Sequence, residues 1–515
     1  TTATANDRVI ADVQRQLGNL EVIRGPLVRK SLMLQTMRLP DQAARLAWLA
    51  EHVPGLPGSG IVYVLTRRDA EVVAGWLQSN GIHAEPYHSA VMHPDFEDTN
   101  AFRLHLENSL LENSIKVLVA TSALGMGFDK PDLGFVIHYQ APNSVVSYYQ
   151  QAGRAGRAVE TAYCVMMSGR EDDDIHTFFR RNAFPDEGAV NRIVRLLAHS
   201  DGLSVRELEE LANLSNGQLS QALKYLSVQT PSPVVKIKSK WLRTSVRYSM
   251  DTERILHLTR QREDEWAEMR GYLDTDRCLM EYLCHALDDR TAGPCGRCSN
   301  CLGRPVVADR VDRRTVIEAT RHLRRAEMVF TPKVMVAKGA FEYYPFSGRL
   351  PEHLRAQEGR ILSRWGDAGW GRLVADDKHG GNFSDELVAA VAEMIQRWNP
   401  APLPTWITCV ESLSHPDLVP AFTRRLARRL DMHFVKALNK IQKNDQQKFQ
   451  RNRFHQCRNL DGVFSVDRVR RGEAVFLVDD VIDSGWTMTI LAALLLQAGS
   501  GPVFPVALAS TSTGD

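Results

Sequence analysis

Short apolar runs separated by helix-length stretches constrain the fold of the first part of this chain most strongly. Between about residues 60 and 168, the runs IVYVL, KVLVAT, GFVIHY and AYCVMM begin at Ile61, Lys116, Gly134 and Ala162. Runs that are apolar throughout predict strands buried on both faces, and their alternation with helical stretches predicts a parallel α/β sheet. A second α/β region is predicted from about residue 398 to the end, with the strands TWITCV, VFLVDD and VFPVAL.

The middle of the chain has a different pattern. From about Pro185 to Thr244, two helices joined by a turn precede VVKIKSKWLRT, which is typical of a strand pair. This order predicts a winged helix. A long charged helix follows, and then a group of cysteines.

Four of the eight cysteines have metal-ligand spacing. Cys278, Cys295, Cys298 and Cys301 form the pattern C-x16-C-x2-C-x2-C. Four thiolates suit tetrahedral Zn²⁺, and the short spacers allow one turn to supply several ligands. Cys284 competes with Cys278 for the first position, but it lies within an apolar helical stretch. The alternative is a set of buried free thiols.

The net charge of the 515 residues is only +2, but the charge is unevenly distributed. From residue 421 to 472 there are 14 Lys and Arg against 4 Asp and Glu, a local excess of 14 − 4 = +10. This stretch is either a solvated helical face or a surface that binds polyanions. No apolar run reaches the roughly 18–20 residues that span a bilayer, and no signal peptide is recognisable. With metal-spaced cysteines, these features predict a reducing, cytoplasmic location and no membrane partner.

The stretch from Val117 to Arg157 combines several groups that suit phosphate. Arg154 and Arg157 lie three residues apart behind a Gly-rich turn, and arginine clamps phosphate oxygens in a fork. A strand that ends in Thr121 and Ser122, followed by Gly-Met-Gly, offers hydroxyl and backbone N–H groups. Each fragment alone is a weak signal, and GRAGR by itself could be a helix cap with solvated arginines, but the joint occurrence in this order is a strong signal for phosphate binding.

These residues resemble the second RecA-like lobe of superfamily 2 helicases, and the RecQ family in particular. The similar segments are GIVYVLTRRDAE for motif IV, YHSAV for the next motif, ATSALGMGFDKPDL for motif V and SYYQQAGRAGR for motif VI. The opening TTATAND resembles motif III. The resemblance implies an ATP-dependent DNA helicase that unwinds 3′ to 5′ in DNA repair or recombination and binds a single-strand/duplex junction. It implies catalytic roles for Gln150, Arg154 and Arg157, nucleotide contacts from Gly127 and Asp129, and DNA contacts from Arg67, Thr121 and Ser122.

One departure from this family limits the expectation. A phosphate-binding G-x-x-x-x-G-K-[ST] loop is absent from the sequence, and no Asp-Glu box for Mg²⁺ precedes the motif III-like opening. We therefore expect the sequence to be the later part of a longer protein whose first lobe holds ATP and Mg²⁺. These residues alone should not hydrolyse ATP.

The middle segments carry two further resemblances. PCGRCSNC is similar to the RecQ zinc module, which favours Cys278 over Cys284 and implies a structural metal. On the predicted wing, Lys236, Lys238 and Trp241 could meet phosphates and stack on a base, or they could belong to a protein-binding surface. The winged helix precedes the zinc module here, whereas it usually follows it in RecQ enzymes.

Near the C-terminus, VFLVDDVIDSGWTMT leads a buried strand into two adjacent carboxylates, Asp479 and Asp480. Carboxylates at the carboxyl edge of a parallel sheet can hold a ribose diol or a hydrated metal. The turn that follows offers backbone N–H and hydroxyl groups for a monoester phosphate. It consists of Asp483, Ser484, Gly485, Trp486 and Thr487. The combination predicts a ribose 5-phosphate ligand, and the alternative is an acidic loop that caps a helix.

This stretch resembles the phosphoribosyl-pyrophosphate motif of type I phosphoribosyltransferases, and the ComF-like branch most closely. NLDGVFSV is also similar to that branch, and TWITCVESLSHPD occupies the place of the pyrophosphate loop, which makes Ser412 and Ser414 candidates. Trp486 stands where many relatives have a smaller residue, and no base-recognition hood is recognisable. The domain is therefore either a transferase, a sensor of phosphoribosyl pyrophosphate or a nucleotide, or a DNA-binding module.

The predicted architecture is a multidomain α/β protein. It comprises the tail of a first RecA-like lobe (1–30), a second lobe (31–185), a winged helix (186–250), a helical zinc module (251–312), a connector with the start of the last domain (313–397) and a phosphoribosyltransferase-like domain (398–515). Expected ligands are structural Zn²⁺, ATP with Mg²⁺, and phosphoribosyl pyrophosphate. The leading function is a RecQ-like helicase; the alternatives are a phosphoribosyltransferase or sensor targeted to DNA, and a non-catalytic DNA-binding scaffold.

Overall fold

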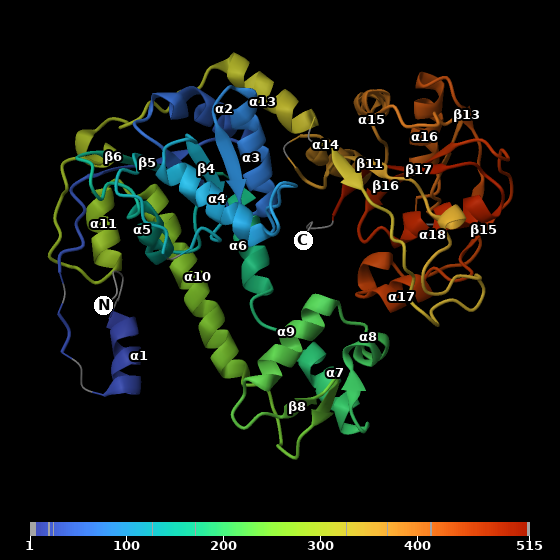
Figure 1. Ribbon diagram of the computed structural model, residues 1–515, viewed down its shortest axis with the longest axis horizontal. Coiled ribbons are helices and arrows are strands. Elements are labelled where there is room, and N and C mark those ends of the chain that lie inside the picture. The colour runs from blue at the N-terminus through green and yellow to red at the C-terminus, as the bar shows by residue number, and fades with distance from the viewer. Residues whose placement is uncertain are drawn as a thin grey trace. The chain divides into compact units, whose positions relative to one another are not determined.

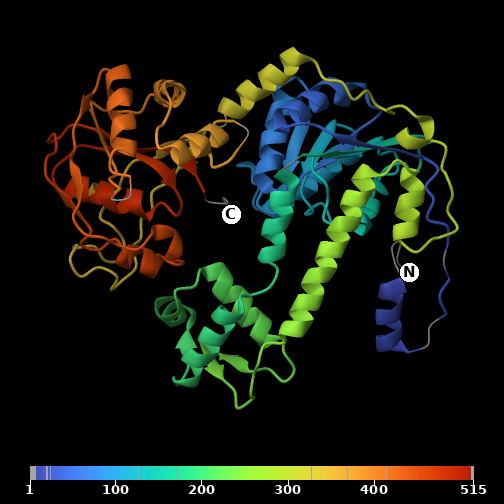
Figure 2. The same cartoon turned by 180° about the vertical axis from the view of Figure 1, so that it is seen from behind.

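The computed structural model describes residues 7–18, 21–23, 25–125, 127–169, 171–325, 327–367, 369–412 and 415–511. The chain divides into two compact units (Figures 1 and 2). The first unit contains Thr1–Ala183 and Thr252–Leu323, and the second contains Phe184–Asp251 and Arg324–Asp515. No described helix has the length and apolar character needed to cross a membrane.

The first unit contains a six-stranded sheet in the order β1-β6-β5-β2-β4-β3. All of its strand pairs are parallel. The strands are β1 (Leu32–Arg38), β2 (Gly60–Tyr63), β3 (Ala84–Tyr87), β4 (Val117–Ala120), β5 (Phe135–His138) and β6 (Ala162–Ser168). The four apolar runs are therefore confirmed as strands of a parallel sheet. The edge strands β1 and β3 were not predicted.

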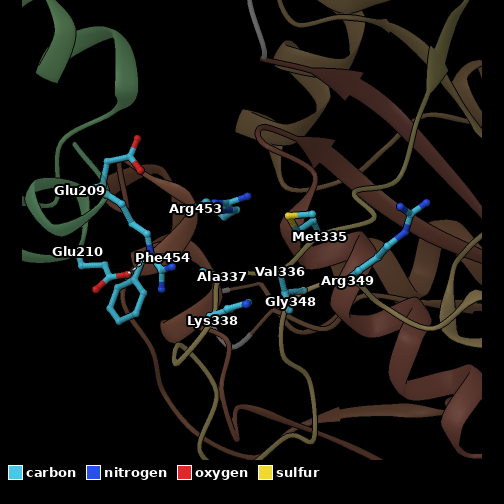
Figure 3. A pocket seen from close by; sticks show the side chains of 11 residues that line it. Glu209, Glu210, Met335, Val336, Ala337, Lys338, Gly348, Arg349, Arg453 and Phe454 are labelled. Carbon is cyan, nitrogen blue, oxygen red and sulfur yellow. Dashed lines mark hydrogen bonds and ion pairs between the residues drawn. The ribbon is translucent and has the colours of Figure 1, made fainter. Parts of the chain in front are cut away.

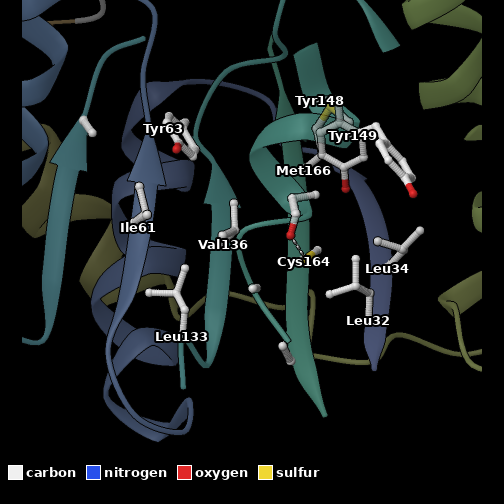
Figure 4. Close-up of a cluster of buried hydrophobic side chains, with 14 of the residues drawn as sticks. Leu32, Leu34, Ile61, Tyr63, Leu133, Val136, Tyr148, Tyr149, Cys164 and Met166 are labelled. Atoms are coloured by element: carbon white, nitrogen blue, oxygen red, sulfur yellow. Dashed lines mark hydrogen bonds between the residues drawn. The ribbon is translucent and has the colours of Figure 1, made fainter. Parts of the chain in front are cut away.

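Successive residues of these strands point to opposite faces, and each face has its own hydrophobic core. Ile61, Tyr63 and Val136 belong to one core (Figure 4), and Val62 and Ile137 belong to the other. The helices that pack on the first face are α4 (Thr99–Leu111), α5 (Val145–Ala152), α10 (Thr252–Asp274) and α11 (Leu279–Ala286). Those on the second face are α2 (Gln42–His52), α3 (Arg67–Ser79) and α13 (Arg313–Arg325). The unit also contains α1 (Asp7–Leu17), α6 (Glu171–Arg181) and α12 (Ser299–Leu302).

The cysteine-containing segment is hydrogen-bonded to this sheet. The buried Gln35 amide on β1 accepts from the backbone N–H of Val307 at 2.9 Å and donates to the carbonyl of the same residue at 3.0 Å. The Trp48 indole donates to the Ala308 carbonyl at 2.7 Å, and Arg297 donates to the Thr161 hydroxyl at 2.9 Å. Residues 252–312 therefore fold as one body with the first sheet and its helices.

The winged helix forms the first part of the second unit. Its elements are α7 (Glu187–Ala198), β7 (Leu203–Ser204), α8 (Val205–Ala212), α9 (Asn216–Ser227), β8 (Val234–Ile237) and β9 (Lys240–Arg243). Ser204 and Ser215 close capping boxes at the starts of α8 and α9, and Asn213 between them has a left-handed backbone. The predicted helix-turn-helix and strand pair are confirmed.

A second six-stranded sheet, in the order β10-β11-β17-β16-β12-β13, lies in the remainder of this unit. All pairs are parallel except β10 with β11. The strands are β10 (Met328–Phe330), β11 (Gly359–Arg364), β12 (Trp406–Cys409), β13 (His433–Phe434), β16 (Val475–Ile482) and β17 (Val503–Ser510). The three predicted strands are confirmed as β12, β16 and β17. β10 and β11 come from the segment 313–397.

Helices cover both faces of the second sheet. The helices α14 (Gly371–Gly380), α15 (Asp385–Trp398) and α16 (Leu418–Arg429) pack on one face, and α18 (Trp486–Gln497) packs on the other. A small pair, β14 (Leu438–Lys440) with β15 (Phe464–Val466), and the short helix α17 (Arg453–Arg458) complete the domain. The carboxyl ends of β12 and β16 thus meet at one edge.

Arg45 on α2 makes a buried contact that we expect the first unit to depend on. Its side chain is 0% exposed, and it donates to the Tyr139 carbonyl at 2.9 Å and contacts Asp172 at 3.4 Å. We expect Arg45→Met to cost about 3–5 kcal/mol near pH 7, because it leaves a buried carboxylate unpaired. The melting temperature of the first unit, measured by calorimetry, should fall by on the order of 10 °C.

The loss should depend on pH. Burial raises the pKa of Asp172, and Arg45 opposes this rise. Removing Arg45 raises the pKa of Asp172 in the folded state further above its value in the unfolded state. The neutral carboxyl therefore contributes to stability at low pH, and this contribution is lost as pH rises through the folded-state pKa. The deficit should therefore shrink as the pH is lowered through the raised pKa of Asp172, and Asp172→Asn should rescue the variant. A deficit that does not change with pH would contradict this account.

Candidate functional site

The loops at the carboxyl edge of the first sheet hold the residues predicted to contact DNA. Arg67 begins α3 and is exposed, and Thr121 and Ser122 follow β4, the neighbour of β2. Thr121 is buried, and its hydroxyl accepts from the Ala123 backbone N–H at 3.3 Å. Ser122 is exposed. The Ser122 and Arg67 side chains are therefore accessible to a ligand, whereas Thr121 shapes the loop.

Arg154 and Arg157 both contact the loop that follows β4, but in different ways. Arg154 donates to the carbonyls of Gly125 and Phe128, each at 2.9 Å. Arg157 pairs with Asp129 at 2.7 Å, and the two side chains are 41% and 57% exposed. Arg154 therefore holds the loop in place, while Arg157 is a solvent-accessible cation that can exchange its partner.

Two further predicted residues lie beside these arginines. Gln150 is exposed on α5, one turn before Arg154. Gly127 has a φ of +111° in the loop that Arg154 holds, a backbone conformation that favours glycine. The segments predicted as motifs V and VI are thus adjacent.

Sequence analysis missed Arg103 on α4, which links the loops after β3 and β4. It donates to the Tyr87 hydroxyl at 2.9 Å and to the Ala123 carbonyl at 3.0 Å. Burial raises the pKa of Tyr87 to about 12, and the hydrogen bond to Glu107 adds to this. Tyr87 therefore stays a neutral donor. Arg103 lies in no motif, so only its helical position opposite Tyr87 could have indicated it.

The four predicted metal ligands lie together. The Sγ atoms of Cys278, Cys295, Cys298 and Cys301 are all within 4.8 Å of one another. Cys278 Sγ accepts from the Cys295 backbone N–H at 3.2 Å, and Cys298 Sγ accepts from the Cys301 backbone N–H at 3.4 Å. Such N–H···S bonds favour thiolates, and a closed set of four sulfurs fits a structural Zn²⁺. Cys284 is outside this set, in the core formed by α11.

The two adjacent aspartates lie at the carboxyl edge of the second sheet, at the end of β16. The Asp480 backbone N–H donates to Asp479 Oδ1 at 2.8 Å. Burial raises the pKa of Asp479 well above its usual value, and the neighbouring Asp480 carboxylate raises it further. Lys378 on α14 pairs with Asp480 at 2.8 Å, with side-chain exposures of 31% and 14%. The helix α14 thus brings a lysine to this edge of the sheet.

The turn after β16 has the backbone that the sequence predicts for a phosphate loop. Gly485 has a φ of +81° and begins α18, and a Cβ there would lie 2.6 Å from the Phe330 ring. Trp486 is buried in the core under the turn. Its large side chain is therefore part of this core and leaves the turn itself open. Asp483 accepts from the Thr511 hydroxyl at 3.1 Å. Ser484 and Thr487 are partly exposed in the same turn.

The loop after β12 is the predicted pyrophosphate loop. Because β12 pairs with β16, this loop lies beside the two aspartates. Ser412 is partly exposed, and its hydroxyl accepts from the His415 backbone N–H at 3.4 Å. Ser414 lies outside the described residues.

The wing residues occupy different environments. Lys238 is exposed at the tip between β8 and β9, with a φ of +56°. Lys236 lies over the Trp241 ring at 5.8 Å, and Trp241 packs against the core of the winged helix. Lys238 is thus accessible to a phosphate, while much of the Trp241 ring is occupied by contacts within the domain.

Comparisons with known proteins match the segment that holds the first of these sites. Residues 45–159 match the family described as helicase conserved C-terminal domain. RecQ-like DNA helicase blm-1 of Caenorhabditis elegans is 33% identical over 217 residues, which is 40% of this chain and 20% of that protein. ATP-dependent DNA helicase RecQ of Synechocystis is 30% identical over 253 residues, 48% of this chain and 50% of that protein. ATP-dependent DNA helicase Q1 of Mus musculus is 35% identical over 178 residues, 33% of this chain and 26% of that protein.

The chain spans half or less of the length of each of these relatives. Residues 45–159 are similar to a helicase C-terminal domain, and the chain is similar to RecQ-like DNA helicases. The expectation of a RecQ-like helicase region is confirmed at this level.

The cysteine cluster yields a direct test. We expect the purified protein to contain about one equivalent of zinc, because four thiolates saturate a tetrahedral ion. Cys298→Ser should lose most of it, whereas Cys284→Ser should keep it. Elemental analysis by mass spectrometry measures both. Zinc loss in Cys284→Ser, with zinc retained in Cys298→Ser, would contradict the ligand assignment.

Proposed function

We propose that this chain is part of a RecQ-like, ATP-dependent 3′–5′ DNA helicase that acts in repair or recombination. In this proposal it supplies the second lobe of the motor and the parts that bind DNA. The contact of Arg154 and Arg157 with the loop 125–129 is the observation that carries this proposal. It brings an exposed guanidinium and a Gly-rich loop to the edge of a parallel sheet where such folds bind ligands. The named relatives support the same motor class.

In the proposed reaction, each residue has a distinct task. Mg²⁺, held by a first lobe, would neutralise charge on the ATP phosphates. Arg157 would leave Asp129 and stabilise the charge that develops on the transferred phosphoryl group. Arg154 keeps the loop, including Gly127, in position for that contact. Arg67 and Ser122 would contact the DNA backbone, so that nucleotide and DNA meet loops of the same sheet.

The role of Arg157 can be tested in a protein that joins a first RecA-like lobe to this chain. We expect Arg157→Ala to lower kcat for DNA-stimulated ATP hydrolysis by about 10³-fold, with little change in KM, because the guanidinium acts on charge that develops in the transition state. Steady-state phosphate release measures this.

Two controls complete the test. Arg181→Ala removes an exposed arginine from the end of α6 and should leave the rate unchanged. The chain without the added lobe should be inactive. Full activity in Arg157→Ala, or ATP hydrolysis by the chain alone, would remove Arg157 and the two-lobe arrangement from the proposal.

We also propose that the second sheet binds a ribose 5-phosphate, with phosphoribosyl pyrophosphate as the leading ligand. The adjacency of the β16 aspartates, the Gly485 turn and the loop after β12 supports this. Asp479 and Asp480 would accept from the ribose hydroxyls, the turn from Ser484 to Thr487 would donate to the 5-phosphate, and Ser412 would face the pyrophosphate. The proposal covers binding, as a transferase or as a sensor.

Removal of the two carboxylates tests this site. The variant Asp479→Asn with Asp480→Asn should weaken binding of phosphoribosyl pyrophosphate with Mg²⁺ by about 100-fold, since each hydrogen bond to a charged group contributes about 1.5–3 kcal/mol. Titration calorimetry measures the affinity. Asp431→Asn is a matched control, because Asp431 is exposed with a φ of +54° that Asn also adopts. Equal affinity in all three proteins would exclude this site.

A further inference from the structure

A cavity of about 350 Å³ lies in the second unit, between the winged helix and the C-terminal α/β domain (Figure 3). Its walls come from three segments: α8, the stretch between β10 and β11, and α17. The lining residues are Arg206, Glu209, Glu210, Met335, Val336, Ala337, Lys338, Gly348, Arg349, Arg453 and Phe454. This volume is within the range of small-molecule sites, roughly 300–1,000 Å³.

The two sides of the cavity are held together by hydrogen bonds that range from buried to exposed. The Asn452 side chain, 7% exposed, donates to the carbonyls of Glu209 at 2.7 Å and Leu214 at 3.1 Å. His455 Nε2 lies 2.8 Å from the Glu210 carbonyl, and the Arg451 backbone N–H donates to Asn213 Oδ1 at 2.9 Å. A cavity whose walls are fixed in this way is preformed, so a ligand does not have to order it.

The cavity has an excess of positive charge. Four cations and two carboxylates line it, a balance of 4 − 2 = +2. Arg206 pairs with Glu210 at 3.0 Å, and Glu209 accepts from the Asn216 amide at 2.9 Å. Lys338, Arg349 and Arg453 have no carboxylate partner within the described part of the chain. Three cations around one cavity favour an anion with several oxygens, such as a phosphate.

The apolar part of the lining narrows the class of ligand. Two lining side chains are apolar and large: Met335 is about half exposed, and Phe454 is partly buried. Figure 3 shows Glu209 and Glu210 on the winged-helix side and Met335, Lys338 and Arg453 on the other. A nucleoside phosphate combines a flat base, which packs on sulfur and aromatic surfaces, with an anion that pairs with Lys and Arg. Inorganic phosphate would leave the apolar wall unused.

We propose that this cavity binds a nucleoside phosphate, either as a free nucleotide or as the 5′-terminal unit of a DNA strand. The phosphate pairs with Lys338, Arg349 and Arg453, and the base packs against Met335 and Phe454. The site is separate from the β16 aspartates and does not depend on the ribosyl-phosphate proposal. It places a DNA-derived ligand against both the winged helix and the C-terminal domain.

The test uses the full chain and a fluorescein-labelled, 5′-phosphorylated dT4 oligonucleotide. The variant Lys338→Gln, Arg349→Gln, Arg453→Gln should bind it at least about 10-fold more weakly by anisotropy, with a salt dependence reduced by up to about 2 in log–log slope. The matched control removes three exposed cations that lie outside the cavity, within the basic stretch 421–472. It is the variant Arg428→Gln, Arg429→Gln, Lys443→Gln. It should bind within about 2-fold of the parent. Equal losses in the two variants, or none in either, would overturn the proposal.

A variant that binds more tightly than the parent cannot owe its change in affinity to misfolding. Glu209→Gln removes a negative charge from the cavity lining and keeps an oxygen for Asn216, so it should tighten binding of the oligonucleotide by about 2- to 3-fold. Unchanged or weaker binding by this variant would count against the site. Thymidine 5′-monophosphate identifies the source of the ligand: displacement of dT4 by the free nucleotide indicates a nucleotide site, and binding that requires the strand and its 5′-phosphate indicates a strand end.

Discussion

The parallel sheet of the first unit requires cover on both faces, and most of the molecule's organisation follows from this need. The second face is covered by α2, α3 and α13, and the first by α4 and α5 together with α10 and α11 from the cysteine-containing segment. Trp266, Met269 and Tyr272 of α10 are buried there. Burial of large apolar side chains contributes roughly 1.5–3 kcal/mol each, so the lobe and the cysteine module stabilise each other. The four sulfurs then hold a short, loop-rich segment that has little apolar core of its own.

The winged helix lies in the sequence between two segments that pack into one folded body. The chain leaves the first unit at Ala183 and returns to it at Thr252, so the winged helix is an excursion between two segments of one folded body. Its hydrogen bonds through Asn213, Glu209 and Glu210 are made with the segment 449–455 of the second unit. With this packing, the wing with Lys238 and the cavity at α8 remain accessible to ligands. The turn between α8 and α9 instead contacts the segment 449–455. Its surface is therefore shaped for this C-terminal domain.

The sequence predicted those elements whose signal is local. Strands β2, β4, β5, β6, β12, β16 and β17 are mainly apolar, and the helix-turn-helix has its own capping residues. Strands β1 and β3 were missed because LMLQTMR contains a buried glutamine and AEPY contains a proline. Gln35 is buried only because the backbone of Val306 and Val307, some 270 residues away in sequence, satisfies its amide. The same reason explains why the sequence did not predict Arg103, the Lys378–Asp480 pair or the cavity at α8. Each depends on contacts between separate segments of the chain, and no local pattern records such contacts.

The charge pairs at the two edges of the sheets differ in how readily a ligand can replace them. Arg157 and Asp129 are both largely exposed. Because exposed ion pairs contribute only about 0–1 kcal/mol, a phosphate can replace Asp129 as the partner of Arg157 with little loss of free energy. Lys378 and Asp480 are more enclosed, so separating them costs more unless the ligand supplies a partner for each. A ribose phosphate does so, because its hydroxyls donate to the carboxylate while its phosphate accepts from the lysine. Under the two proposals, the second edge would therefore favour a ligand that carries both groups over one that carries phosphate alone, whereas the first edge would select for phosphate charge.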